Sequence, residues 1–202
     1  MRNDSRSAPL TPEERWGELG LYGARGMSGG EALARQLDYQ ASNRLLSVNT
    51  PHGLTIRLRY LTWDNGGDQW LRRAGITATD RTIARWKNGQ QRPRPANLKK
   101  IDRAFWIRRR AHLTECYKRR LWDDGRGTRI EIHPVNQKQV EANRHRELRV
   151  RRINVRMQWA PIVDAWSSND YAALDDLWQS IASDLGSDHS AYSYVSHVGF
   201  GV

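Results

Sequence analysis

The chain has 202 residues, of which 33 are Lys or Arg and 22 are Asp or Glu, so its formal net charge is +11. An apolar content of 38% with nine tryptophans is sufficient for compact cores, which excludes a wholly disordered protein. The strongly basic balance indicates a polyanionic partner such as DNA.

Several classes of protein are disfavoured by what the sequence lacks. No apolar run approaches the ~20 residues of a membrane-spanning helix, and the opening segment MRNDSRSAPLTPEER lacks the apolar stretch of a secretory signal. The single cysteine, Cys116, excludes an internal disulfide and a multi-cysteine metal site. The histidines show no metal-binding spacing, and no Gly-rich phosphate loop is present. We therefore expect a cytoplasmic, nucleoid-associated protein without membrane partner, metal, cofactor or catalytic residue.

The charge is unevenly distributed along the chain. Residues 54–126 carry 19 Lys and Arg against 7 Asp and Glu, whereas residues 159–202 carry 6 acidic residues and no Lys or Arg. This asymmetry predicts a DNA-binding module joined to a surface of a different kind.

The N-terminal part of the chain changes character near residue 31. Residues 1–30 show no sustained period and predict a flexible arm, whereas residues 31–46 place apolar side chains at helical spacing and open a helical DNA-binding domain expected over 31–126. Residues 54–63 are ambiguous, because their first half alternates like a strand and their second half suits a helix. The helices that follow favour a helix.

Residues 67–89 have the layout of a helix-turn-helix. A short first helix ends at Gly75, which suits a C-terminal cap. Thr77 or Thr79 can cap the second helix, expected from about residue 80 to 88, because a threonine hydroxyl accepts an unpaired backbone N–H. Ile83 and Trp86 lie on one face and predict its buried side. The turn is longer than in the commonest units of this kind.

The second helix predicts a set of DNA contacts. Its first residues would reach base edges in the major groove, where Arg81 and Arg85 can bind guanine and Thr82 a base edge or a phosphate. Cations at the helix exit would contact the phosphate backbone. The alternative is a basic solvated helix hairpin without a partner. The predicted set comprises Thr79, Arg81, Thr82, Arg85, Lys87, Arg92, Arg94, Lys99 and Lys100.

The second half of the chain predicts a different architecture. Pro95 can open a long helix that runs to about residue 122. The period then changes to two in residues 128–132, 148–158 and 191–202, which predict strands. Two helices, at 159–166 and 170–186, lie between the second and third of these. The fold class is therefore α+β: a mainly helical N-terminal helix-turn-helix domain, then a small β-β-α-α-β domain over 127–202.

The order and spacing of these elements resemble the terminal proteins that cap the telomeres of linear actinomycete chromosomes and plasmids. The resemblance covers roughly residues 67–202. It rests on RTIARWKNGQQRPRPANLKKIDRAF in the helix-turn-helix and on RGTRIEI, LRVRRINVRMQ, WAPIVDAW, YAALDDLWQSIASDLG and AYSYVSHVGFGV in the second domain.

The resemblance implies binding to replicon ends and a role in priming their replication. A side-chain hydroxyl would be joined to the first nucleotide, and the partners would be a telomere-associated helper protein and a DNA polymerase. The family carries a Glu-Thr pair on the first strand, but here Ile132 follows Glu131, so Thr128 is the nearest substitute. Tyr and Ser residues of the last strand are further candidates.

A second hypothesis keeps the same DNA-binding region. The protein would then be a transcriptional regulator whose C-terminal domain forms a homodimer and which binds a palindromic operator. Both hypotheses describe a non-enzymatic DNA-binding protein; the first adds that it accepts a nucleotide.

Overall fold

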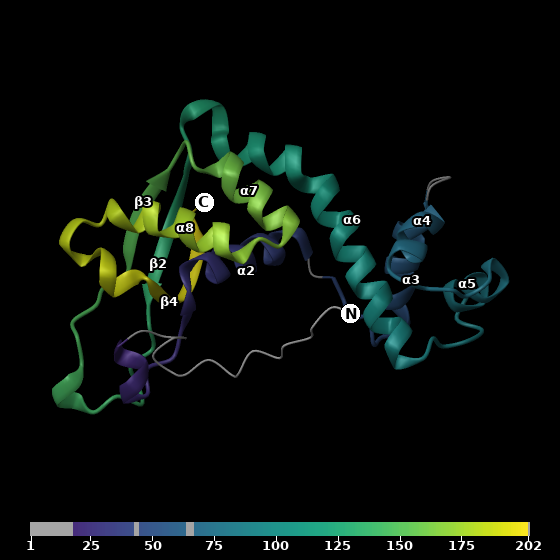
Figure 1. Ribbon diagram of the computed structural model, residues 1–202, viewed down its shortest axis with the longest axis horizontal. Coiled ribbons are helices and arrows are strands. Elements are labelled where there is room, and N and C mark those ends of the chain that lie inside the picture. Colours follow the sequence, from purple (N-terminus) through teal and green to yellow (C-terminus); the bar gives the residue numbers. More distant parts are fainter. Residues whose placement is uncertain (1–17, 43–44, 64–66, 202) are drawn as a thin grey trace, which may run out of the picture. The chain divides into compact units, whose positions relative to one another are not determined.

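The computed structural model describes residues 18–42, 45–63 and 67–201, and its contacts divide the chain into two compact units. Unit 1 comprises Met1–Asp38 together with Tyr117–Val202, and unit 2 comprises Tyr39–Cys116. Helices and a small antiparallel sheet are both present (Figure 1), which confirms the expected α+β class with a helical region preceding the main strands. In sequence, unit 2 is an insertion between two segments of unit 1.

Unit 2 is built from helices. They are α3 (Pro51–Leu61), α4 (Gly67–Arg73), α5 (Asp80–Lys87) and the N-terminal part of α6 (Pro95–Trp122). The ambiguous residues 54–63 are helical because Thr50 caps α3, accepting the Gly53 N–H at 3.0 Å, and Pro51 occupies its first turn. Side chains from all four helices and from the turn after α4 form one core: Leu54, Leu58, Leu61, Leu71, Ile76, Ile83, Trp86, Leu98, Ile101, Ala104 and Phe105.

Unit 1 contains a four-stranded antiparallel sheet with the strand order β1-β4-β2-β3. In the register, Met27 lies opposite Val195, and Ile130 lies between Ile153 and Phe200. The strands are β1 (Met27–Ser28), β2 (Thr128–Pro134), β3 (Arg151–Val155) and β4 (Tyr194–Phe200).

Helices α2 (Gly29–Ser42), α7 (Trp159–Ser168) and α8 (Tyr171–Ser183) complete this unit (Figure 1). Trp166 donates its indole N–H to Asp38 of α2 at 2.9 Å. The ring of Trp159 packs edge-on against Phe200, with 5.1 Å between the ring centroids. The β2 positions between Arg129 and His133 alternate between buried isoleucines and outward polar residues. One face of the sheet is therefore covered and the other is polar and open.

The described residues also include four short 3-10 helices. They are η1 (Glu18–Tyr22), η2 (Asp123–Gly125), η3 (Ala142–Arg144) and η4 (Gly186–Tyr192).

The arrangement differs from the sequence prediction at the N-terminus. The flexible arm expected over residues 1–30 does not hold for residues 18–30, which form η1 and β1 and begin α2; residues 1–17 lie outside the described residues. The units also do not follow the expected boundaries at residues 31 and 127, because α2 and the last residues of α6 contribute to unit 1. No helix in the described part of the chain is long and apolar enough to cross a membrane.

Candidate nucleic-acid interface

The turn between α4 and α5 begins with a Schellman motif. The Ile76 N–H bonds the Leu71 carbonyl at 3.0 Å and the Gly75 N–H bonds the Arg72 carbonyl at 2.8 Å. Gly75 has a φ of +75°, a left-handed conformation that glycine adopts without a steric penalty. The structure therefore ends α4 at the glycine that the sequence predicts.

Arg72 fixes the rest of the turn. Its guanidinium donates to the carbonyls of Ile76 at 3.1 Å and Ala78 at 2.6 Å, and it forms an ion pair with Asp80 at 3.1 Å. Asp80 is the first residue of α5, so this one side chain joins the end of α4 to the start of α5. The sequence prediction missed this role because the three partners show no periodic pattern.

Helix α5 is capped at both ends, and its N-terminal cap is Thr79, one of the two threonines that the sequence offers. The Thr79 hydroxyl accepts the Thr82 N–H at 3.3 Å, and Gly89 closes a second Schellman motif with a φ of +72°. Ile83 and Trp86 are each only 4% exposed and belong to the core of unit 2. Their burial sets which side of α5 faces solvent.

Arg81 and Arg85 lie one helical turn apart on the side of α5 opposite Ile83 and Trp86. Both are exposed, and neither makes a hydrogen bond or ion pair through its side chain to another described residue. Ala84 and Asn88 share this exposed side. Asparagine can pair with adenine, and alanine can pack on a thymine methyl group. Neither was among the predicted DNA contacts, although the helical period that selects Arg81 and Arg85 also selects them.

The other predicted contacts separate into two groups. Arg94 and Lys99 are exposed, without a polar partner among the described residues. Arg92, in contrast, donates to the Asn49 carbonyl at 2.9 Å, and Lys100 donates to the Gly75 carbonyl at 2.8 Å. These two cations therefore also hold unit 2 together.

The remaining predicted residues of α5 also have intramolecular neighbours. Lys87 reaches the Thr62 hydroxyl at 3.5 Å, and the hydroxyl oxygens of Thr79 and Thr82 lie 3.1 Å apart. The cap therefore already engages both threonine hydroxyls.

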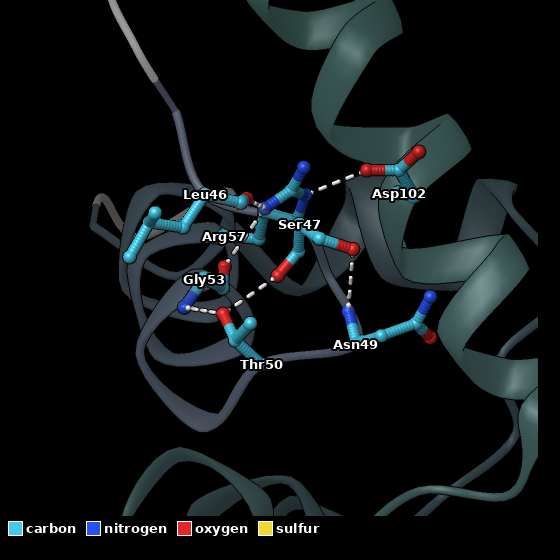
Figure 2. Close-up of polar contacts among 7 residues, drawn as sticks. All are labelled: Leu46, Ser47, Asn49, Thr50, Gly53, Arg57 and Asp102. Atoms are coloured by element: carbon cyan, nitrogen blue, oxygen red, sulfur yellow. Dashed lines mark hydrogen bonds and ion pairs between the residues drawn. The ribbon is translucent and has the colours of Figure 1, made fainter.

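A buried arginine positions the segment that Arg92 contacts (Figure 2). Arg57 of α3 is 5% exposed and donates to Asp102 of α6 at 2.6 Å and to the carbonyls of Leu46 and Gly53 at 2.7 and 3.0 Å. Charge-assisted bonds of this kind are strong where water is excluded. They tie the segment before α3 to α6, and with it the Asn49 carbonyl that receives Arg92.

Thr128, the attachment residue implied by the resemblance, belongs to unit 1, whereas the nine predicted DNA contacts belong to unit 2. It is the first residue of β2 and is half-buried. Its hydroxyl donates to the Leu121 carbonyl at 2.8 Å, near the C-terminal end of α6. The hydroxyl thus has a structural role at the junction of α6 and β2.

No protein-family model matches the sequence, and neither does any curated protein or solved structure with which it was compared. Within the described residues, no group of three or more His, Cys, Asp or Glu side chains is arranged to hold a metal ion.

Proposed function

We propose that this protein binds duplex DNA through α4, the turn and α5, with the exposed side of α5 in the major groove. The observation that carries the proposal is the side-chain arrangement of α5. Arg81 and Arg85 face away from the core and have no polar partner among the described residues, although their neighbours Arg72 and Arg92 are engaged. Unpaired arginines on one side of a capped helix suit bidentate recognition of guanine.

The phosphate contacts in this proposal come from the exit of α5. Arg94 and Lys99 are exposed cations beyond Gly89, where contacts to the backbone would set the register of the protein on DNA. Arg92 contributes through the donors that its bond to Asn49 leaves unused.

Substitution of Arg81 and of Arg85 by alanine tests base reading. Each change should cost about 1–3 kcal/mol of binding free energy on the preferred site and relax sequence choice at one position, because a bidentate contact is lost. The measurement is selection from random duplex DNA followed by titration of the selected site.

Arg35→Ala is the matched control, since Arg35 is an exposed arginine of unit 1 that pairs with Glu31. It should leave both affinity and sequence choice unchanged. Uniform weakening of all sequences by Arg81→Ala and Arg85→Ala would instead reduce these residues to phosphate contacts and refute base reading.

We further propose that the DNA bound is a replicon end and that the protein is a telomere terminal protein. Support for this finer assignment is the resemblance in the order of elements from residue 67 onward. Titration of terminal fragments, hairpins and single strands against an internal palindrome tests it. Preference for the palindrome, together with a dimeric complex, would favour the regulator hypothesis.

The terminal-protein proposal includes a priming step. The hydroxyl oxygen of the protein would attack the α-phosphorus of a deoxynucleoside triphosphate, forming a phosphoester while the bond to pyrophosphate breaks and the hydroxyl proton passes to a base. A DNA polymerase would catalyse this transfer. Thr128 can serve only if its hydroxyl leaves the Leu121 carbonyl.

Labelling with a radioactive deoxynucleotide in the presence of template and polymerase tests Thr128. Thr128→Ser should keep the label on the protein and Thr128→Ala should abolish it. Because the alanine variant also loses a hydrogen bond worth about 1 kcal/mol, its unfolding must be measured in parallel. A folded Thr128→Ala protein that still carries label would exclude Thr128.

A further inference from the structure

Unit 1 contains a groove of about 660 Å³ where the turn after α6 meets β2 and β3. No aliphatic or aromatic side chain lines it, so it is unlike an apolar ligand pocket. Four arginines and one carboxylate provide its charged groups: Arg120, Arg126, Arg129, Arg152 and Asp123.

The register of the sheet brings two of these arginines together. Arg129 lies opposite Asn154 and Glu131 lies opposite Arg152, so Arg129 and Arg152 are diagonal neighbours on the open face. Glu131 is bound by Arg152, and a hydrogen bond from that guanidinium lowers the pKa of Glu131. Arg129 makes no ion pair with another described residue.

Asp123, the carboxylate that lines the groove, is also engaged. Arg126 forms two hydrogen bonds with Asp123, each 2.9 Å long. With Asp123 and Glu131 both held by arginines, the groove keeps a net positive charge, and Arg129 provides donors that the fold does not use. Several guanidinium groups around one concave surface suit phosphate groups.

The same turn carries an exposed aromatic ring. Trp122, the last residue of α6, is 46% exposed, and a Cβ placed on Gly125 would lie 3.9 Å from its ring. Gly127 allows the turn to lie close to β3, because a Cβ at this position would lie 2.2 Å from the Val155 carbonyl oxygen. Trp122 precedes Asp123, which lines the groove. An exposed indole can stack with an unpaired base, whereas bases in a duplex have their faces covered by their neighbours.

We propose that this groove binds a single strand of nucleic acid, with phosphates on Arg129 and the neighbouring arginines and an unpaired base on Trp122. The site lies in unit 1, outside α4 and α5, and takes a different form of nucleic acid from the duplex interface. It is therefore a second binding activity that does not depend on the first.

The full-length protein tests this proposal in two parallel titrations. One uses a fluorescent oligothymidylate of about twelve nucleotides, and the other a fluorescent duplex that carries the preferred site selected from random duplex DNA. Trp122→Ala should weaken binding of the single strand about 5- to 150-fold, the range for loss of one stacked base. Arg129→Ala should make the slope of log K against log salt concentration shallower by about 0.7.

Arg35→Ala in α2 is the matched control for Arg129→Ala, because it removes an equal charge from an exposed site of the same unit. The groove variants should leave duplex affinity at the level of this control, and only Arg81→Ala and Arg85→Ala should lower it. If the proposed duplex interface is wrong, only the duplex titration departs from expectation, so that failure is distinguishable from a failure of the groove proposal.

Three results would overturn the proposal. The first is single-strand binding by Trp122→Ala and Arg129→Ala that is equal to that of Arg35→Ala. The second is a parallel loss of single-strand and duplex binding in the groove variants. The third is displacement of the oligonucleotide by a free nucleoside triphosphate at equal concentration, which would assign the groove to a nucleotide.

Discussion

At the residue scale, Arg57 shows how one buried charge joins the segment before α3 to α6. Replacement by Met should lower the free energy of opening α3 by about 3 kcal/mol, because Asp102 and two carbonyls lose their donor. Amide hydrogen exchange in α3 measures this change for unit 2 alone. The double variant Arg57→Met/Asp102→Leu should recover part of the loss, since no unpaired carboxylate remains.

Arg59→Met provides the comparison on the same helix. Arg59 is exposed, so its replacement should change the free energy of opening by less than about 0.5 kcal/mol. Equal effects of the Arg57 and Arg59 substitutions would show that the buried bonds do not support α3.

Residue roles could be predicted from the sequence only where they depend on local geometry. The outward orientation of Arg81 and Arg85 follows from the helical period and the apolar pair Ile83 and Trp86. The bonds of Arg92 and Lys100 could not be predicted, because their acceptors lie 43 and 25 residues away. A count of charges therefore overestimates how many cations lack an intramolecular partner.

At the element scale, Gly30 and Gly89 show two structural reasons for a glycine. Gly30 leaves room for a neighbouring helix, and Gly89 adopts a left-handed backbone conformation. A Cβ on Gly30 of α2 would lie 2.4 Å from a carboxylate oxygen of Asp175 and 2.6 Å from its backbone nitrogen, in α8. Gly30→Ala should therefore destabilise unit 1 by about 2–3 kcal/mol through overpacking. Gly89 faces open space but has a φ of +72°, so Gly89→Ala should cost only about 1 kcal/mol.

Gly199→Ala is the neutral reference, because its Cβ would meet only atoms at ordinary contact distances of 3.8 Å or more. Amide hydrogen exchange in α8 measures the effect of Gly30→Ala on unit 1, and exchange in α5 measures the effect of Gly89→Ala on unit 2. A Gly30→Ala protein as stable as the Gly199→Ala protein would mean that α2 and α8 separate easily.

The elements that were predicted carry local end signals. Helix α5 is bounded by Thr79 and Gly89, and α3 by a threonine cap followed by Pro51. Strand β1 has only two residues, and its partner is β4 at the other end of the described chain. A pairing over that sequence distance leaves no local pattern. The sequence therefore predicts the other three strands but not β1.

At the scale of the whole molecule, the distribution of charge along the chain was easier to predict than the boundaries between the two units. The basic middle and acidic end of the chain follow directly from composition. The division into units does not, because α6 is one continuous helix across the boundary after Cys116. The helical pattern of α6 does not mark where one core ends and the next begins.

The insertion of unit 2 into unit 1 also has a consequence for synthesis on the ribosome. All of unit 2 has been translated once Cys116 is added, whereas β1 has no strand to pair with until Val195 emerges. Strand β1 must therefore remain unpaired while the inserted unit and most of the second half are made. In the nascent chain, unit 2 is complete before the sheet of unit 1 can form.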